Sequence, residues 1–129
     1  MPGDNSATVA VGAAVEFPQD GPTVGTGPPT RFSVTEFTLP ATGTYLVNAQ
    51  VSFDEAGQLQ IALDGVGLPD TVVGRATGTS QLIINTLIAA TAGQRLSIIN
   101  PTGNVAALTI TPIAGGTHSV SATLIITRL

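Results

Sequence analysis

Polar and apolar residues alternate with a period of two between Gly43 and Phe53, in the segment GTYLVNAQVSF. One set of alternate positions is apolar and consists of Tyr45, Val47, Ala49, Val51 and Phe53. The other set is mainly polar and consists of Thr44, Leu46, Asn48, Gln50 and Ser52. Successive side chains of a strand point to opposite sides, so a period of two residues indicates a β-strand with one buried face. We therefore predict a strand here, with its apolar set in the core.

The next segment, GQLQIALDG, repeats this alternation. We expect two sets of side chains on it: inward Leu59, Ile61 and Leu63, and outward Gln58, Gln60 and Asp64. Between the two strands, residues 54–57 read DEAG, which has the composition of a hairpin turn. The Asp-Gly pair at residues 64–65 is expected to end the second strand, because this pair is favoured in tight hairpins.

Further strands are predicted at residues 71–77, 80–91 and 94–101 and at the C-terminus, each bounded by Gly, Pro or Asn. Several short strands with regular turn signals indicate an antiparallel sandwich or barrel. Residues 80–91, SQLIINTLIAAT, are apolar on both faces, so a helix is the alternative interpretation. Their Thr and β-branched content favours a strand.

The C-terminal segment VSATLIITRL is also apolar on both faces. Such a strand needs cover on each side, one from the domain's own core and one from a second layer or a second chain. Only 9% of the residues are charged and 43% are hydrophobic, so a lone copy would expose much neutral surface. These features favour association.

Composition excludes several classes of function. The chain has no Cys and no Lys, and its four Arg residues are scattered, with a net charge of -4. A nucleic-acid interface needs clustered cations, so none is expected. We see no signal peptide and no membrane segment, and we expect no membrane insertion. The start, MPGDN, suits an artificial N-terminus, so we expect a fragment of a longer protein.

Two motifs carry a resemblance to a known superfamily. FTLPATGTYLVNAQVSF is similar to the signature of the tumour necrosis factor and complement globular-head superfamily through Phe37, Gly43, Tyr45, Gln50 and Val51. AGQRLSIIN, residues 92–100, resembles the Gly-Asp-Arg-Leu-Ser turn and strand of tumour necrosis factors, with Gln94 at the Asp position. The order and spacing of strands over residues 12–129 most resemble the C-terminal domains of collagen-like glycoproteins on the exosporium of Bacillus-type spores.

The resemblance implies an all-β, ten-stranded jelly-roll sandwich that forms a homotrimer around a threefold axis. Residues 1–11 would be an N-terminal extension and residues 12–129 the trimerisation domain. The inner sheet of that family faces the axis, which would cover the second apolar face of the last strand. The side chains then expected at the trimer interface are Leu46, Asn48, Gln50, Ile83, Asn85, Leu87, Thr123, Ile125, Thr127 and Leu129. Those expected in the core are Tyr45, Val47, Leu82, Ile84, Ile88, Leu124 and Ile126.

The function implied is a non-enzymatic structural head that trimerises and caps a collagen-like stalk on the spore surface, outside the cell. The alternative is the head of a surface protein or phage fibre that binds a glycan or a host protein through its loops. For that role we expect contacts from Glu55, Asp70 and Arg75, which are charges on predicted turns of a charge-poor chain. The absence of Trp, and a Tyr45 expected inside, leave no obvious platform for sugar stacking.

Catalytic and metal-binding chemistry has little support in the sequence. His118 is the only histidine, with Ser119 and Ser121 beside it, and no GxSxG elbow is present. The acidic residues near residues 54–55 and 64–70 do not follow the spacing of a calcium loop. We therefore expect no catalytic residue, no metal site and no cofactor.

Overall fold

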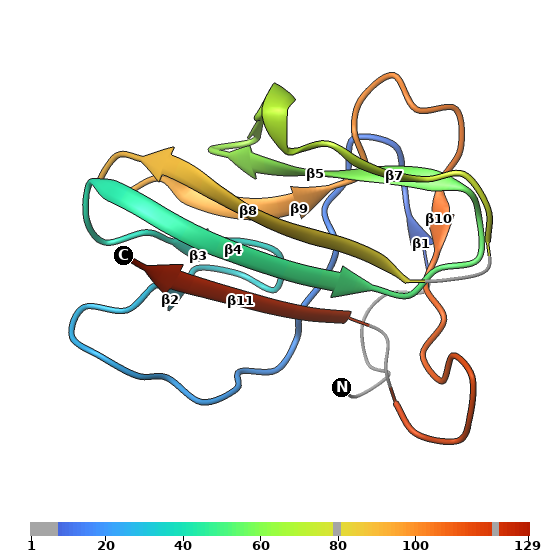
Figure 1. Ribbon diagram of the computed structural model, residues 1–129, viewed down its shortest axis with the longest axis horizontal. Helices are drawn as coiled ribbons and strands as arrows, with labels where there is room; N and C mark the ends of the chain where they lie inside the picture. Colours follow the sequence, from blue (N-terminus) through green and yellow to red (C-terminus); the bar gives the residue numbers. More distant parts are fainter. Residues whose placement is uncertain (1–7, 79–80, 120–121) are drawn as a thin grey trace.

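The alternating segment becomes β4 (Gly43–Val51), the central strand of a three-stranded antiparallel sheet, in a computed structural model that describes residues 8–78, 81–119 and 122–129. Its neighbours are β8 (Leu82–Ala90) on one side and β11 (Ala122–Arg128) on the other (Figure 1). Pairing with β8 is continuous from Gly43 opposite Ala90 to Val51 opposite Leu82. Residues 80–91 therefore supply a strand, and the helical alternative is wrong.

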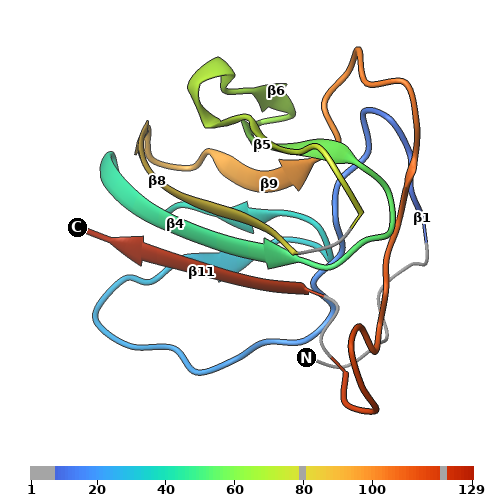
Figure 2. The same ribbon diagram turned by 45° about the vertical axis from the view of Figure 1, so that its right-hand side comes forward.

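A second antiparallel sheet has the order β2 (Thr30–Arg31), β3 (Phe37–Thr38), β9 (Arg95–Ile99), β5 (Gly57–Leu63) and β6 (Val66–Gly67). The strand β7 (Val73–Arg75) also pairs with β5, after a short 3-10 turn, η1 (Pro69–Thr71). A small third sheet joins β1 (Thr8–Val9) to β10 (Leu108–Thr109). Figures 1 and 2 show the two larger sheets as layers, with β8, β4 and β11 in one and β9 and β5 in the other. The all-β prediction is confirmed, and the sheets form a sandwich-like arrangement.

The core lies between these layers and is filled by the predicted inward sets. Tyr45, Val47 and Ile84 come from one sheet, and Leu59 and Ile61 come from the other; all five are fully buried. Leu82 and Ile88 are also buried, and Leu124 and Ile126 of β11 are partly buried against the same cluster. The Tyr45 hydroxyl donates a hydrogen bond to the Ala41 carbonyl (2.6 Å), so its one polar group is paired at the edge of the core.

The prediction of a hairpin at residues 54–57 is wrong, because β4 and β5 belong to different sheets. Residues 52–56 cross from one layer to the other, which lets both apolar sets face a single core from opposite sides. The crossing segment pairs instead with residues near β10, through a bridge between Phe53 and Ile110 and hydrogen bonds to Ser52 and from Asp54. By contrast, the two-residue turn at Asp64 and Gly65 is confirmed: both have positive φ, 52° and 80°, and Leu63 pairs with Val66.

Three further details differ from the sequence-based expectations. Across the described residues the chain forms eleven strands, five of them only two residues long, so the expected count of ten is not reproduced. The packed region includes Val9, which lies inside the expected extension 1–11, because Val9 is buried and pairs with Leu108. Gln60 is half-buried instead of facing water, since its side chain fills the space above Gly67.

Asn100, at the end of β9, is a fully buried polar residue that ties three segments together. Its side-chain amide donates to the carbonyls of Val9 (3.2 Å) and Ala106 (3.1 Å), and its oxygen accepts from Asn104 Nδ2 (2.8 Å). Its backbone carbonyl accepts a hydrogen bond from the Gly12 N–H (2.7 Å). One amide thus links the N-terminal segment, the end of β9 and the 101–107 loop.

Asn100→Ala is expected to lower the free energy of unfolding by about 2–4 kcal/mol, because each buried polar group left unpaired costs about 1–3 kcal/mol. Asn104→Ala, which removes only one of the three side-chain hydrogen bonds, is the control and should cost about 1 kcal/mol. Urea unfolding at one fixed protein concentration measures both values. Equal losses for the two variants would contradict the central role of Asn100.

Candidate functional site

The side of the β11–β4–β8 sheet that faces away from the core is the candidate site, and we call it the outer face. Strand register places its residues in cross-strand rows. One row contains Thr123, Gln50 and Ile83; the middle row contains Ile125, Asn48 and Asn85; the third contains Thr127, Leu46 and Leu87. Leu129 continues the alternation of β11, and its N–H donates to the Thr44 carbonyl (3.0 Å). The structure therefore brings all ten residues expected at a trimer interface onto one face of one sheet.

Four large aliphatic side chains on the outer face are exposed. The exposed fractions are 57% for Ile83, 58% for Leu87, 53% for Ile125 and 67% for Leu129. Every side chain in the three rows is uncharged, so the face combines aliphatic groups with neutral amides and hydroxyls. An exposed apolar surface of this kind is typical of a site that another molecule covers.

The three loop residues proposed for ligand contact do not form one group. Arg75 and Glu55 are neighbours: the Arg75 Nη2 donates to the Glu55 backbone carbonyl (2.6 Å) and to the Phe53 carbonyl. The guanidinium also lies over the Phe53 ring, 4.0 Å from its centroid. Asp70 is exposed in η1, and none of the described contacts of Arg75 or Glu55 involves it. The structure thus joins two of the three residues and gives both an internal structural role.

The Glu55 carboxylate links the crossing segment, residues 52–56, to β10 by hydrogen bonds. It accepts hydrogen bonds from the Thr109 N–H (2.7 Å) and the Thr109 hydroxyl (2.6 Å). Slight burial alone would raise the pKa of Glu55, but the Thr109 hydrogen bonds, a backbone hydrogen bond of Glu55 itself and the charge of Arg75 outweigh it. The pKa of Glu55 therefore lies below its ordinary value of 4.5. The pKa of Arg75 is also lowered, in this case by burial, and the negative charges of Glu55 and Asp54 oppose part of that shift.

Arg75 also borders an open depression of about 560 Å³ beside β5 and β7. The residues that line it are Ala56, Gly57, Gln58, Gly74, Arg75, Ala76, Gly103, Asn104, Val105 and Ala106. None of these described lining residues is aromatic, so the depression offers no ring on which a sugar could stack.

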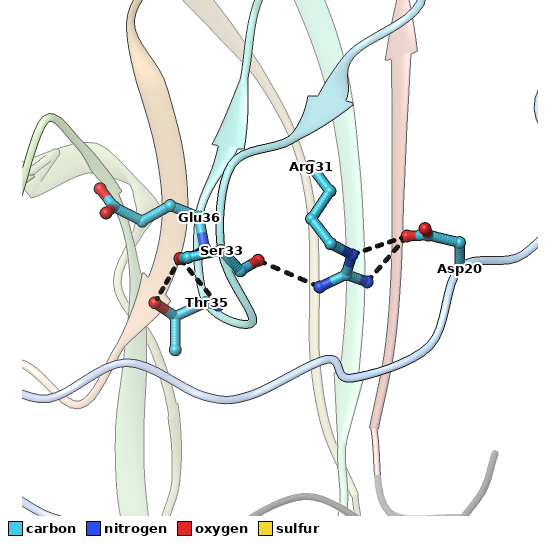
Figure 3. Close-up of polar contacts among 5 residues, drawn as sticks. All are labelled: Asp20, Arg31, Ser33, Thr35 and Glu36. Atoms are coloured by element: carbon cyan, nitrogen blue, oxygen red, sulfur yellow. Dashed lines mark hydrogen bonds and ion pairs between the residues drawn. The ribbon is translucent and has the colours of Figure 1, made fainter.

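A second charged cluster orders the loop before β2 and the turn between β2 and β3. The Arg31 Nε donates a hydrogen bond to one Asp20 carboxylate oxygen (2.9 Å), and Nη2 forms an ion pair with the same oxygen (2.8 Å), as Figure 3 shows. The Nη1 of Arg31 donates to the Ser33 carbonyl (3.0 Å). The Ser33 hydroxyl accepts hydrogen bonds from the N–H groups of Thr35 and Glu36, which closes the turn. These contacts give Arg31 a role within the chain.

His118 is exposed in the loop between β10 and β11; Ser121 lies outside the described residues. Over residues 8–78, 81–119 and 122–129, no three His, Asp or Glu side chains meet at a possible metal site. Within the same ranges, no helix is long and apolar enough to span a membrane.

Because the folded-state pKa of Glu55 is depressed, its ionised form stabilises the protein above its unfolded pKa, and this contribution is lost as the pH falls through the folded pKa. Glu55→Gln, which does not titrate, should therefore be less stable than the wild type near pH 7, with the difference shrinking as the pH falls below 4.5 and vanishing below the folded-state pKa. Urea unfolding across this range measures the difference. Thr109→Val removes one of the hydrogen bonds and should shrink it, whereas a difference that does not change with pH would contradict this account.

The chain matches no protein-family model and no curated protein. The outer face is the candidate site because of its strand register, its exposed aliphatic side chains and its uncharged chemistry.

Proposed function

We propose that this chain is a non-enzymatic structural head that assembles as a homotrimer through the outer face of the β11–β4–β8 sheet. The observation that carries the proposal is the set of four large aliphatic side chains, each more than half exposed, on an uncharged face. If 2,000 Å² or more is removed from water, as in obligate interfaces, burial at about 25 cal/mol per Å² supplies tens of kcal/mol before entropy is subtracted.

A second copy of the chain is a suitable partner for this face. The net charge of -4 opposes approach between charged surfaces of two copies, whereas the side chains of the three rows on the outer face are all uncharged. Amides and hydroxyls can pair with the same groups on another copy, because each both donates and accepts. β11 then has cover on both sides, from the core and from neighbouring copies.

Threefold assembly and the jelly-roll fold are the finer parts of the proposal. They are supported by the resemblance to the tumour necrosis factor and complement-head superfamily, carried by Phe37, Gly43 and Tyr45 and by residues 92–100. The strand connections add support: β3, β5 and β9 lie in one sheet, and β4, β8 and β11 lie in the other. The chain thus passes repeatedly between two layers, as the two wrapped sheets of a jelly roll require.

The biological setting that we propose is the tip of a collagen-like stalk on the exosporium of a spore, outside the cell. Its support is the resemblance in strand order and spacing to the heads of collagen-like exosporium glycoproteins. The proposal assigns no catalysis, because His118 is exposed and a hydrolase requires a nucleophile, a base and an acid in contact. Gly-X-Y repeats encoded immediately before Met1 in the native gene would support the stalk, and a different upstream sequence would oppose it.

Ile83→Asp is expected to abolish the trimer, because it would place three carboxylates in a dry interface, where an unpaired charge costs several kcal/mol. Ile113→Asp is the matched control, since Ile113 is exposed to a similar extent (54%) but lies in the loop between β10 and β11. Light scattering coupled to size exclusion should give about three times 12.9 kDa for the wild type and the control, and one chain mass for Ile83→Asp.

Circular dichroism checks that each variant is folded before its mass is interpreted. A wild type that is monomeric, or that has another single stoichiometry, would contradict the trimer. A trimer unperturbed by Ile83→Asp would show that the interface lies elsewhere on the molecule.

A further inference from the structure

The middle row of the outer face carries two primary amides side by side. Asn48 on β4 lies directly opposite Asn85 on β8, and Ile125 completes the row on β11. Asn48 is half-buried and Asn85 is exposed. Within the part of the chain that the structure describes, neither side-chain amide forms a hydrogen bond. Both amides therefore keep their full hydrogen-bonding capacity for groups outside this copy.

The neighbouring rows differ in chemistry from this one. On one side, Leu46 and Leu87 are opposite each other, and on the other side Ile83 is paired with Gln50. A buried amide is tolerated only when it is hydrogen-bonded, and an aliphatic side chain offers it no partner. An alignment of copies that set Asn48 and Asn85 against Leu46 and Leu87 would leave the amides unsatisfied. Alignment of amide rows with one another would satisfy them.

A primary amide also suits closed rotational symmetry. It has donors and an acceptor, so equivalent amides around an axis can each donate to the next copy and accept from the previous one. A carboxylate or an ammonium group cannot do this, because each lacks either donors or acceptors when charged. In coiled coils, one buried polar residue similarly selects the register and the number of chains, at some cost in stability.

We propose that Asn48 and Asn85 form a hydrogen-bonded layer between copies, which determines how many copies assemble and how they align along the axis. The aliphatic side chains on the same face supply the affinity, and the amide layer supplies the specificity. This inference rests on the proposed function, because it takes the outer face to be the contact between copies.

The test compares two double variants that add leucines to the same face. Asn48→Leu with Asn85→Leu removes the amide layer, whereas Thr123→Leu with Thr127→Leu, on β11, adds leucines and leaves the amides in place. Native mass spectrometry of the purified chains measures the distribution of masses. The amide variant should lose the single trimeric mass and give a mixture of species without a lower melting temperature. The threonine variant should keep the trimer as its only species.

If the leucine variant precipitates, Asn48→Ser with Asn85→Ser is measured instead, since it removes both amides without adding apolar surface. It too should lose the single mass. A trimeric wild type with an amide variant that is also uniquely trimeric would overturn the amide layer and leave the proposed function standing. Loss of the single mass in the threonine variant as well would also overturn it, because added leucine would then be the cause. A monomeric wild type would overturn both proposals.

Discussion

The organisation of this protein depends on the register between β4 and its two neighbours. Nine residue pairs join β4 to β8 and seven join it to β11, without interruption. This pairing aligns the alternation of three strands, so that Tyr45, Ile84 and Leu124 share the core side while Leu46, Asn85 and Ile125 share the other. A slip of one residue in either pairing would turn a whole strand over and place polar groups in the core. The core and the outer face are therefore two consequences of the same register.

Several of the few charged residues stabilise this arrangement through contacts within the chain. Three of the four arginines lie over phenylalanine rings: Arg31 over Phe37, Arg75 over Phe53 and Arg95 over Phe32. A guanidinium over a ring shields apolar surface and remains partly hydrated. Together with Glu55 on Thr109, and with the neutral Asn100 network, these groups close the parts of the sandwich where regular strand pairing ends. Two of the three loop charges that the sequence offered for a ligand, Glu55 and Arg75, thus have intramolecular partners.

The outer face has the opposite character: among the described residues its amide and hydroxyl side chains form no hydrogen bond, and most of its large aliphatic side chains are exposed. Contact between copies would give hydrogen-bond partners to these polar groups and would bury the aliphatic side chains. The same face then has two separable contributions, since the gain from burying Ile83, Leu87 and Leu129 does not depend strongly on alignment, whereas the pairing of Asn48 and Asn85 does. A surface made only of aliphatic side chains would associate with less selectivity. In the proposed assembly, this division would let a charge-poor chain associate in a defined way without interfacial ion pairs.

The sequence by itself determined the all-β class, the main strands, the inward sets of β4 and β5 and the turn at Asp64 and Gly65. These features depend on a period of two residues and on local backbone preferences, both of which are written in neighbouring residues. Only the tertiary structure decided that residues 52–56 cross between sheets, that Gln60 is half-buried and that Val9 belongs to the packed region. Likewise, Glu55 meets Thr109, 54 positions away, and Asn100 meets Val9, 91 positions away. Such partners depend on how the layers stack, and alternation along one strand carries no information about which distant segment will lie beside it.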